Sequence, residues 1–421
     1  MNSLSEANTK FMFDLFQQFR KSQKNNTFYS PISITTALGM VLLGAKDNTA
    51  QQINKVLHFD QFTENTTEKA ATHHLKIANK LFGEKTYQFL QVNFTFHLQP
   101  GVCASEWPNG RKQGTWVCLT HGSSIYSECI SSISTTLPHW SIPNPDNTSE
   151  YLDAIKKFYQ TSVESVDFAE APEESRKKIN SWVESQTNEK IKNLLPDGTI
   201  DNGTRLVLVN AIYFKGQWQN KFNKENTKEE KFWPNKNTYK SVQMMRQNES
   251  FNFALLEDVQ AKVLEIPYKG KDLSMIVLLP NEINGLQKLE EKLTAEKLLE
   301  WTSLQNMREA HVDLHLPRFK VEERYDLKDT LRNMGMVDIF NGDADLSGMT
   351  GSRGLIVSEV LHKAFVEVTE EGAEAAAATA VTGFSSPPSA NEEFHCNHPF
   401  LFFIRQNKTN SILFFGRFSS P

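Results

Sequence analysis

The chain has 421 residues, of which 39% are hydrophobic and 23% charged, and its formal net charge is -5 at pH 7. This length provides a large apolar core, and the mildly acidic balance argues against nucleic acid as the main partner. No apolar run reaches the length of a transmembrane helix, so no membrane partner is expected. Lys10 and Asp14 interrupt the apolar pattern of the first residues, which excludes a signal peptide and favours a cytoplasmic location.

The N-terminal half contains several helical patterns. Apolar residues at helical spacing predict a helix over about 4–19, and a second helix begins near Ser33, with Pro31 tolerated in its first turn. The same periodicity predicts helices over 151–159 and 173–194. The run 75–82 fits a short helix or a strand equally well.

The C-terminal half is richer in strands. Residues 206–214 form a continuous β-prone run, which suits a strand covered on both faces. Two hairpins are predicted, one from 263–268 to 273–279 and one from 400–404 to 412–415. A further strand is predicted over 311–317, and a helix over 325–334 with Gly335 as its stop. Helices early and strands late, without regular βαβ alternation, favour an α+β fold.

The window 92–149 differs from the rest of the chain. It has five charged residues in 58, and it contains three of the four cysteines: Cys103, Cys118 and Cys129. Its sequence has neither a helical nor a strand period, and the cysteine spacings match no zinc pattern. We interpret the window as a disordered, atypical insertion within a single domain spanning 1–421, although a structured insert with its own cysteine chemistry is the alternative.

Catalytic and cofactor motifs are absent. The chain has no G-x-S-x-G elbow, H-E-x-x-H helix, phosphate loop or dinucleotide-binding glycine motif. We therefore expect no enzyme, no cofactor, no catalytic residue and no metal site, although a triad scattered along the sequence would escape this search.

The most informative segment begins at Gly372. As a strand it would place Ala373, Ala375, Ala377 and Thr379 on one face, where small side chains enter a packed interior easily. An alanine-rich helix is the alternative, and composition alone does not decide between them. A tract from Ser385 to Ser389 that suits no regular element follows. The whole segment therefore fits a loop that is exposed in one state and able to become a strand in another.

Several motifs together resemble the serpins, specifically the intracellular ovalbumin-type (clade B) branch that includes the squamous cell carcinoma antigens. The matching stretches are Phe28-Tyr-Ser-Pro-Ile-Ser-Ile34, Leu208-Val-Asn-Ala-Ile-Tyr-Phe-Lys-Gly-Gln-Trp218, Asp313-Leu-His-Leu-Pro-Arg-Phe319, Leu361-His-Lys-Ala-Phe365, Glu370-Glu-Gly-Ala-Glu-Ala-Ala-Ala-Ala-Thr379 and Asn397-His-Pro-Phe-Leu-Phe-Phe-Ile404. The resemblance covers nearly everything outside 92–149. It implies helices packed around a large central mixed sheet, two smaller sheets, and an exposed reactive-centre loop near the C-terminus.

The resemblance also implies a function. A target protease would cleave the exposed loop, and the cleaved loop would then insert as a new strand in the central sheet, trapping the protease as an acyl-enzyme. The hinge of this loop would comprise Glu370, Glu371, Gly372, Ala373, Ala375, Ala377 and Thr379. The residues that control sheet opening would be Ser30, Ser33, Asn210 and His362. The expected partners are target proteases, and the expected state is a monomer, with release outside the cell left open.

The position of the cleaved bond is less well defined. Family spacing points to Ser386–Pro387, but proline after the cut bond disfavours most proteases. We therefore favour Ser385–Ser386, which places Phe384 second before the cut, as papain-like cysteine proteases prefer. Cleavage at Phe384–Ser385 by a chymotrypsin-like serine protease is the alternative.

The chain departs from the family pattern at two places. About two dozen residues, including a helix that covers part of the central sheet, are missing between Thr72 and Leu75, and the window 92–149 is added. Both changes would remove or disturb packing, so this form is expected to be less stable and a weak inhibitor or none. A non-inhibitory binding or storage serpin and a hydrolase are the competing hypotheses.

Overall fold

The structure is a computed structural model that describes residues 3–22, 25–61, 75–90, 151–214, 216–303, 305–372 and 391–421. Its helices are α1 (Ser3–Ser22), α2 (Pro31–Leu42), α3 (Asp47–Val56), α4 (Tyr151–Tyr159), α5 (Pro172–Gln186), α6 (Leu286–Lys292), α7 (Ala295–Trp301), α8 (Lys328–Asn333) and α9 (Ser347–Thr350). Short 3-10 turns lie at Phe59–Gln61, Lys224–Asn226 and Asp338–Phe340. None of the described helices is long and apolar enough to span a membrane.

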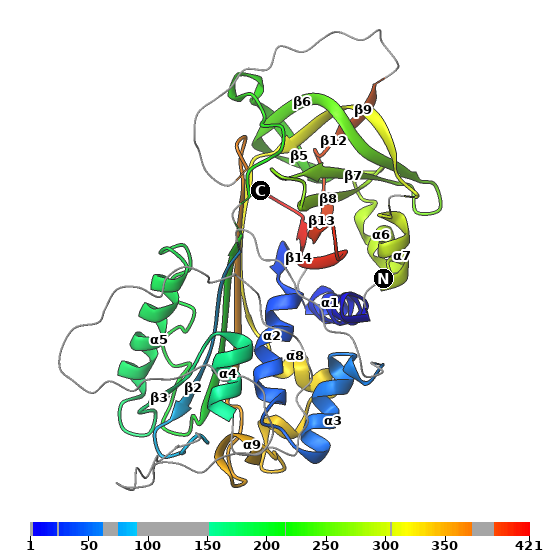
Figure 1. Ribbon diagram of the computed structural model, residues 1–421. Helices are drawn as coiled ribbons and strands as arrows, with labels where there is room; N and C mark the ends of the chain where they lie inside the picture. Colours follow the sequence, from blue (N-terminus) through cyan, green and yellow to red (C-terminus); the bar gives the residue numbers. More distant parts are fainter. Residues whose placement is uncertain are drawn as a thin grey trace, which may run out of the picture.

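Five strands form a mixed sheet in the order β10-β11-β4-β2-β3. They are β2 (Leu75–Glu84), β3 (Val163–Val166), β4 (Leu206–Phe214), β10 (Phe319–Asp326) and β11 (Glu359–Val368). In Figure 1 helix α5 lies on one side of this sheet, and α2, α4 and α8 lie on the other. Because helices cover both faces, every residue of β4 is buried, as the apolar run 206–214 predicts.

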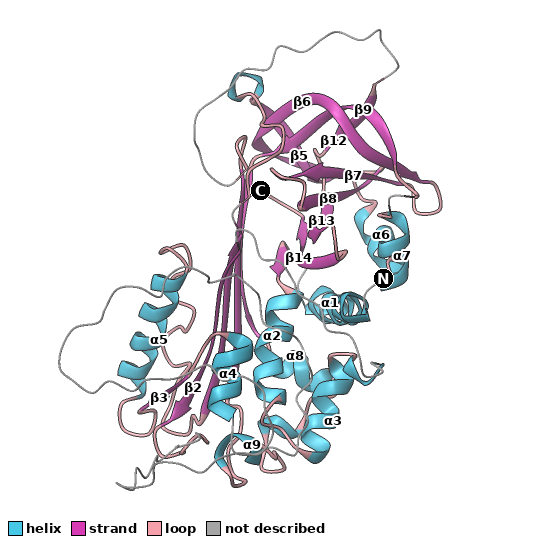
Figure 2. Ribbon diagram, in the orientation of Figure 1, coloured by secondary structure: helices cyan, strands magenta, loops and turns pink. Residues whose placement is uncertain are grey.

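The remaining strands form a nine-stranded sheet at the top of Figure 2. Its strands are β1 (Thr27–Tyr29), β5 (Lys228–Asn235), β6 (Thr238–Leu256), β7 (Ala261–Pro267), β8 (Leu273–Pro280), β9 (Arg308–Pro317), β12 (Glu392–His395), β13 (Phe400–Gln406) and β14 (Ser411–Phe418). The α+β fold with helices around a large mixed sheet is confirmed. The two further sheets that the resemblance implies are joined here into one hydrogen-bonded path through the long strand β6.

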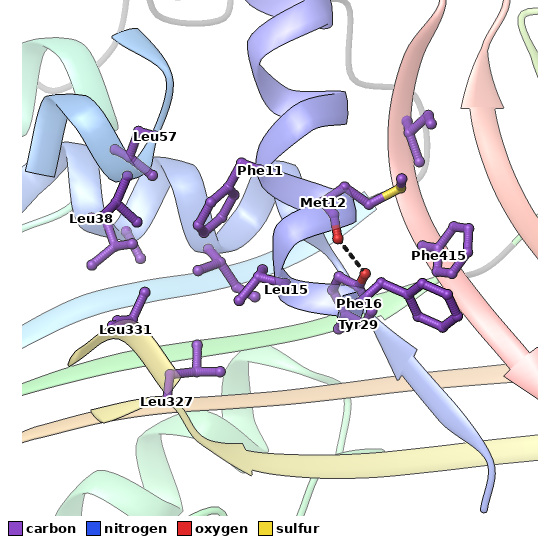
Figure 3. Close-up of a cluster of buried hydrophobic side chains, with 14 of the residues drawn as sticks. Phe11, Met12, Leu15, Phe16, Tyr29, Leu38, Leu57, Leu327, Leu331 and Phe415 are labelled. Atoms are coloured by element: carbon purple, nitrogen blue, oxygen red, sulfur yellow. Dashed lines mark hydrogen bonds between the residues drawn. The ribbon is translucent and has the colours of Figure 1, made fainter. Parts of the chain in front are cut away.

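The apolar core has three parts. Side chains from α1, α2 and α3 pack on one face of the five-stranded sheet, and Figure 3 shows Phe11, Leu15, Leu38 and Leu57 among them. In the same view the Tyr29 hydroxyl donates a hydrogen bond of 2.7 Å to the carbonyl of Met12. A second cluster lies within the nine-stranded sheet, and a third lies between α5 and the opposite face of β4.

Two helices are shorter than their sequence patterns predict. The prediction over 173–194 is wrong beyond Gln186, because Asn188, Glu189 and Asn193 have positive φ angles that end helical geometry. Leu194 still faces the core, but from a loop. The prediction over 325–334 is wrong at its start, because Tyr325 belongs to β10 and pairs with His362 of β11. The ambiguous run 75–82 is a strand.

Candidate functional site

The predicted cleavage region lies outside the described residues. Phe384, Ser385 and Ser386 are therefore not placed by the structure, and neither is any hinge position from Ala373 to Thr379. The structure does describe the chain up to Gly372 and the sheet beneath it. The site is built from these two parts.

Gly372 is the point where the chain leaves the sheet. Its φ of +94° is a backbone conformation that residues with a side chain rarely adopt. A Cβ added at this position would also overlap the carbonyl oxygen of Gly216. A turn holds the segment in place, since the Gly372 N–H donates to the Thr369 carbonyl at 3.1 Å. Glycine is thus required here for backbone conformation and for space.

The neighbouring hinge residues are anchored to the segment 216–227. The indole N–H of Trp218 donates to the Thr369 carbonyl at 2.8 Å, and its ring stacks on Tyr268 with centroids 4.6 Å apart. The backbone N–H of Phe222 donates to the Glu370 carbonyl at 2.9 Å. These bonds fix the start of the hinge against the end of the five-stranded sheet.

Charged groups add to this anchoring. The carboxylate of Glu370 is buried and accepts a 2.9 Å hydrogen bond from Thr227, and Arg318 lies 3.9 Å away. Glu371 pairs with Lys224 at 2.8 Å, and this hydrogen bond raises the pKa of the lysine. The buried carboxylate is the stronger anchor, because exposed ion pairs contribute little to stability.

Below the hinge, β11 runs parallel to β4. Their register pairs Glu359 with Val207 and continues to Val366 with Phe214. A strand that turns back after β11 would run antiparallel to it. Both sides of β11 are occupied, by β10 in an antiparallel pair and by β4 in a parallel pair, so the strand would enter between β11 and β4. Such a strand would replace one parallel pairing with two antiparallel ones, and antiparallel pairing is slightly more stable per residue.

A row of polar side chains crosses the middle of this sheet. By register Tyr325 lies opposite His362, His362 opposite Asn210, and Asn210 opposite Asn79. Along β4, Leu208 on one side of Asn210 belongs to the helix-covered core, and Ile212 on the other side belongs to the core of the nine-stranded sheet. The polar row therefore lies at the seam between two apolar clusters.

Hydrogen bonds join this row to helix α2. The Asn210 amide donates to the Ser33 hydroxyl at 2.5 Å and to the Ser33 carbonyl at 3.0 Å, and it also bonds Asn79. Ser30 caps the helix by accepting from the Ser33 N–H at 3.3 Å. The Ser30 hydroxyl in turn donates to the Leu413 carbonyl of β14 at 2.6 Å. The network is buried, and through Ser30 and Asn210 it links helix α2 to both sheets.

His362 is held as a neutral imidazole. The Ser30 backbone N–H donates to its Nε2 at 3.1 Å, so Nε2 must carry a lone pair and the proton sits on Nδ1, which bonds the Asn210 side-chain oxygen. Desolvation by burial lowers the pKa of His362 to about 3. Protonation would therefore break the bond to Ser30.

The structure thus brings Ser30, Ser33, Asn210 and His362 into one network. Asn79 belongs to the same network, and the sequence analysis did not identify it. The signal was weak, because Asn79 lies between Lys76 and Lys80 in the run 75–82, and its amide needs a partner only once the strand places it inside the sheet. Trp218 and Thr227 were missed as hinge anchors because their contacts depend on the folded path of the chain.

Comparisons with known proteins agree with this geometry. A sequence model of the family described as serpin (serine protease inhibitor) matches residues 6–99 and 134–421. Human Serpin B3 is 72% identical over 448 aligned positions that cover 100% of both chains. The crystal structure of uncleaved ovalbumin has a TM-score of 0.78 at 34% identity, covering 100% of both chains. The loop-inserted structure of a cleaved ovalbumin mutant has a TM-score of 0.75 at 33% identity, again covering 100% of both.

Proposed function

The chain belongs to the serpin family, and from this premise we propose that it is a suicide-substrate inhibitor of a papain-like cysteine protease. The observation that carries the proposal is the parallel pair β4–β11 directly below the anchored hinge at Gly372. An inserted loop would separate these two strands. A loop-inserted form is known for a related ovalbumin mutant, which supports this direction of change.

The proposed reaction begins as ordinary proteolysis. The protease thiolate attacks the carbonyl carbon of Ser385, the peptide bond to Ser386 breaks, and the nitrogen of Ser386 leaves with a proton. Ser385 is now joined to the enzyme as a thioester. Insertion of residues from Ala373 onward then carries the bound protease, still attached to Ser385, along the sheet before water hydrolyses the thioester.

Small residues in the hinge support rapid insertion. Ala373, Ala375, Ala377 and Thr379 alternate along the proposed strand, so one face of that strand would add little volume to a packed interior. The strand must pass the buried row containing His362 and Asn210, whose direct bond has to break. Hydrogen bonds suit this role because they can form again with a new partner between the strands.

One experiment tests the reaction and the target class. The purified protein is incubated with a papain-like and with a chymotrypsin-like protease, and covalent complexes are detected by denaturing electrophoresis. We expect a complex with the cysteine protease and a released C-terminal peptide that begins at Ser386. A peptide beginning at Ser385 would indicate the serine-protease alternative.

The variant Ala375→Arg is the matched control. Its loop should still be cleaved, but its charged side chain should slow insertion, so the protease is released instead of trapped. Cleavage of the unaltered protein without any complex would identify a non-inhibitory serpin. Peptide hydrolysis by the protein itself would identify a hydrolase.

The unusual window 92–149 bears on the strength of inhibition. The family model leaves residues 100–133 unmatched, and these lie inside the window, which supports its interpretation as an insertion. We expect this form to inhibit less well than a variant in which the window is removed and the missing segment after Thr72 is restored. Equal yields of complex from the two proteins would refute this expectation.

The remaining parts of the proposal concern state and location. We expect a cytoplasmic monomer that needs no cofactor, nucleic acid or membrane, with release outside the cell as the alternative. Gel filtration and fractionation of expressing cells test these expectations directly.

A further inference from the structure

Three side chains from three strands meet on the nine-stranded sheet. Glu230 comes from β5, His315 from β9 and His395 from β12, and their ligand-type atoms all lie within 4.8 Å of one another. The two histidines are register partners on parallel strands, and their ring centroids are 4.5 Å apart. This cluster lies outside the hinge and the polar row described above.

The spacing of these atoms fits one small cation. One carboxylate oxygen of Glu230 lies 2.9 Å from Nε2 of His395, and the other lies 3.7 Å from Nδ1 of His315. Ligands about 2.1 Å from a tetrahedral zinc ion are separated by about 3.4 Å. The two separations, one from each oxygen of Glu230, lie on either side of this value, and the three ligand atoms lie within 4.8 Å of one another, so side-chain rotations that draw them together would complete the geometry.

A carboxylate lies near the other ring nitrogen of each histidine. Asp313 lies 3.5 Å from Nε2 of His315, and Glu393 lies 3.8 Å from Nδ1 of His395. Metal-binding histidines commonly donate their other ring N–H to a carboxylate, and a bound metal would replace the proton that Nε2 of His395 now donates to Glu230 at 2.9 Å. Nδ1 of His315 is buried and has no hydrogen-bond partner, which is the state expected of an unused ligand atom.

The electrostatic surroundings are compatible with a cation. Arg246 of β6 is the register partner of His315, but it forms hydrogen bonds of 2.8 and 2.6 Å to Asp313, which offset its charge. The three ligand side chains are between 14% and 31% exposed, so an ion and a water molecule can reach them.

We propose that Glu230, His315 and His395 form a binding site for a divalent transition metal of the zinc class, with water at the open position. Two imidazoles and one carboxylate favour zinc, cobalt or nickel over calcium and magnesium, which prefer oxygen ligands. β12 is a four-residue strand paired with β9, and the described chain resumes just before it at Asn391. A bound metal would fasten β12 to β5 and β9, and so fix the C-terminal attachment of the loop.

Cobalt titration tests the proposal. The untagged protein is treated with a chelator, Co²⁺ is added, and the visible absorption of tetrahedral cobalt is followed until zinc displaces it. We expect one site per chain, and at least a tenfold loss of affinity in Glu230→Gln and in His395→Ala. His311→Ala is the matched control, because His311 is exposed on the same strand β9 but lies outside the cluster.

Circular dichroism verifies that each variant is folded. The absence of a cobalt band in the unaltered protein, or an unchanged band in folded His395→Ala, would overturn the proposal. In that case the cobalt would be assigned to the cysteine thiols, which Glu230→Gln and His395→Ala both retain. As a second readout, zinc should slow amide hydrogen exchange in β12 of the unaltered protein but not in Glu230→Gln.

Discussion

The two sheets of this molecule both contain fully buried strands, but they are held together differently. In the nine-stranded sheet β8 and β13 are buried along their whole length, and Phe28 stacks on Phe402 and Phe414 at centroid distances of 5.8 and 5.2 Å. In the five-stranded sheet the buried faces of β4 and β11 are interrupted by Asn210 and His362. Apolar packing has no alternative partners to exchange, whereas hydrogen bonds can be broken and formed again.

This difference indicates in which sheet neighbouring strands can separate more easily. Separating strands in the nine-stranded sheet would expose aromatic side chains, each of which stabilises the fold by several kcal/mol through burial and packing. Separating β4 from β11 at the polar row breaks hydrogen bonds that contribute about 1 kcal/mol each if new partners replace the old ones, although the register partners Tyr213 and Phe365, with ring centroids 5.4 Å apart, would also separate. The polar row therefore marks where we expect β4 and β11 to separate most easily.

The largest expected effect comes from the aromatic core. Phe402→Ala should lower the free energy of unfolding by about 3–5 kcal/mol, because it leaves a cavity beside Phe28 and Phe319. Urea unfolding followed by circular dichroism measures the change. The milder variant Phe402→Leu should lose less. The comparison between the sheets would be contradicted if Phe402→Ala accelerated loop insertion as well as lowering the free energy of unfolding.

The second prediction concerns the polar row itself. Asn210→Ala should cost about 2–4 kcal/mol, because Ser33, Asn79 and His362 lose a buried hydrogen-bond partner. It should also accelerate polymer formation on heating, measured by native electrophoresis, since the sheet opens more easily. Asn202→Ala, in an exposed turn, is the control. An effect on stability without faster polymerisation would assign Asn210 a structural role alone.

The third prediction is a dependence on pH. Folding lowers the pKa of His362 from 6.5 to about 3, so the unfolded chain binds more protons between these values. Stability should therefore fall as the pH drops below 6.5, by about 1.4 kcal/mol per pH unit at most. Urea midpoints measured against pH should fall more steeply in the unaltered protein than in His362→Gln, which retains His315 and His398, whose pKa values burial also lowers.

Other groups titrate in the same range. Burial raises the pKa values of Glu323 and Glu359 to about 7, so folding favours their protonated forms and stability from these groups increases as the pH falls. Both glutamates remain in His362→Gln, and their contribution cancels in the difference between the two proteins. Parallel pH profiles for the two proteins would contradict the assignment to His362.

The smallest effect is expected at the surface of the hinge. Lys224→Ala removes the ion pair with Glu371 but leaves the buried bonds of Glu370 in place. We expect no measurable change in the urea midpoint, because exposed ion pairs are screened by solvent. Thr227→Val is the sharper variant, since it removes the buried hydrogen bond to Glu370. A larger loss from Lys224→Ala than from Thr227→Val would reverse this ranking.

Much of the fold could be predicted from local sequence. Pro31 follows the capping residue Ser30, and the start of α2 agrees with that pattern. The continuous apolar run of β4 identified a strand covered on both faces. The helix predicted over 173–194 was too long, because apolar periodicity continues into a loop whose buried residues mimic it. β6 was not predicted, since its exposed residues hide its 19-residue length.

The candidate site was predictable only in part. The polarity of Asn210 within an apolar run indicated a buried hydrogen bond, but its partners are distant in sequence and depend on strand register. The cluster of Glu230, His315 and His395 has no local spacing that sequence motifs describe, because three separate strands supply it. Register and topology therefore carry the information that local sequence lacks.

Ser30 lies where the two sheets meet. Its backbone N–H is bonded to His362 in one sheet, while its hydroxyl is bonded to Leu413 in the other. If β11 shifts, the bond to His362 can break while the hydroxyl keeps helix α2 attached to β14. Helix α2 would then stay with β14 while β11 moves past it.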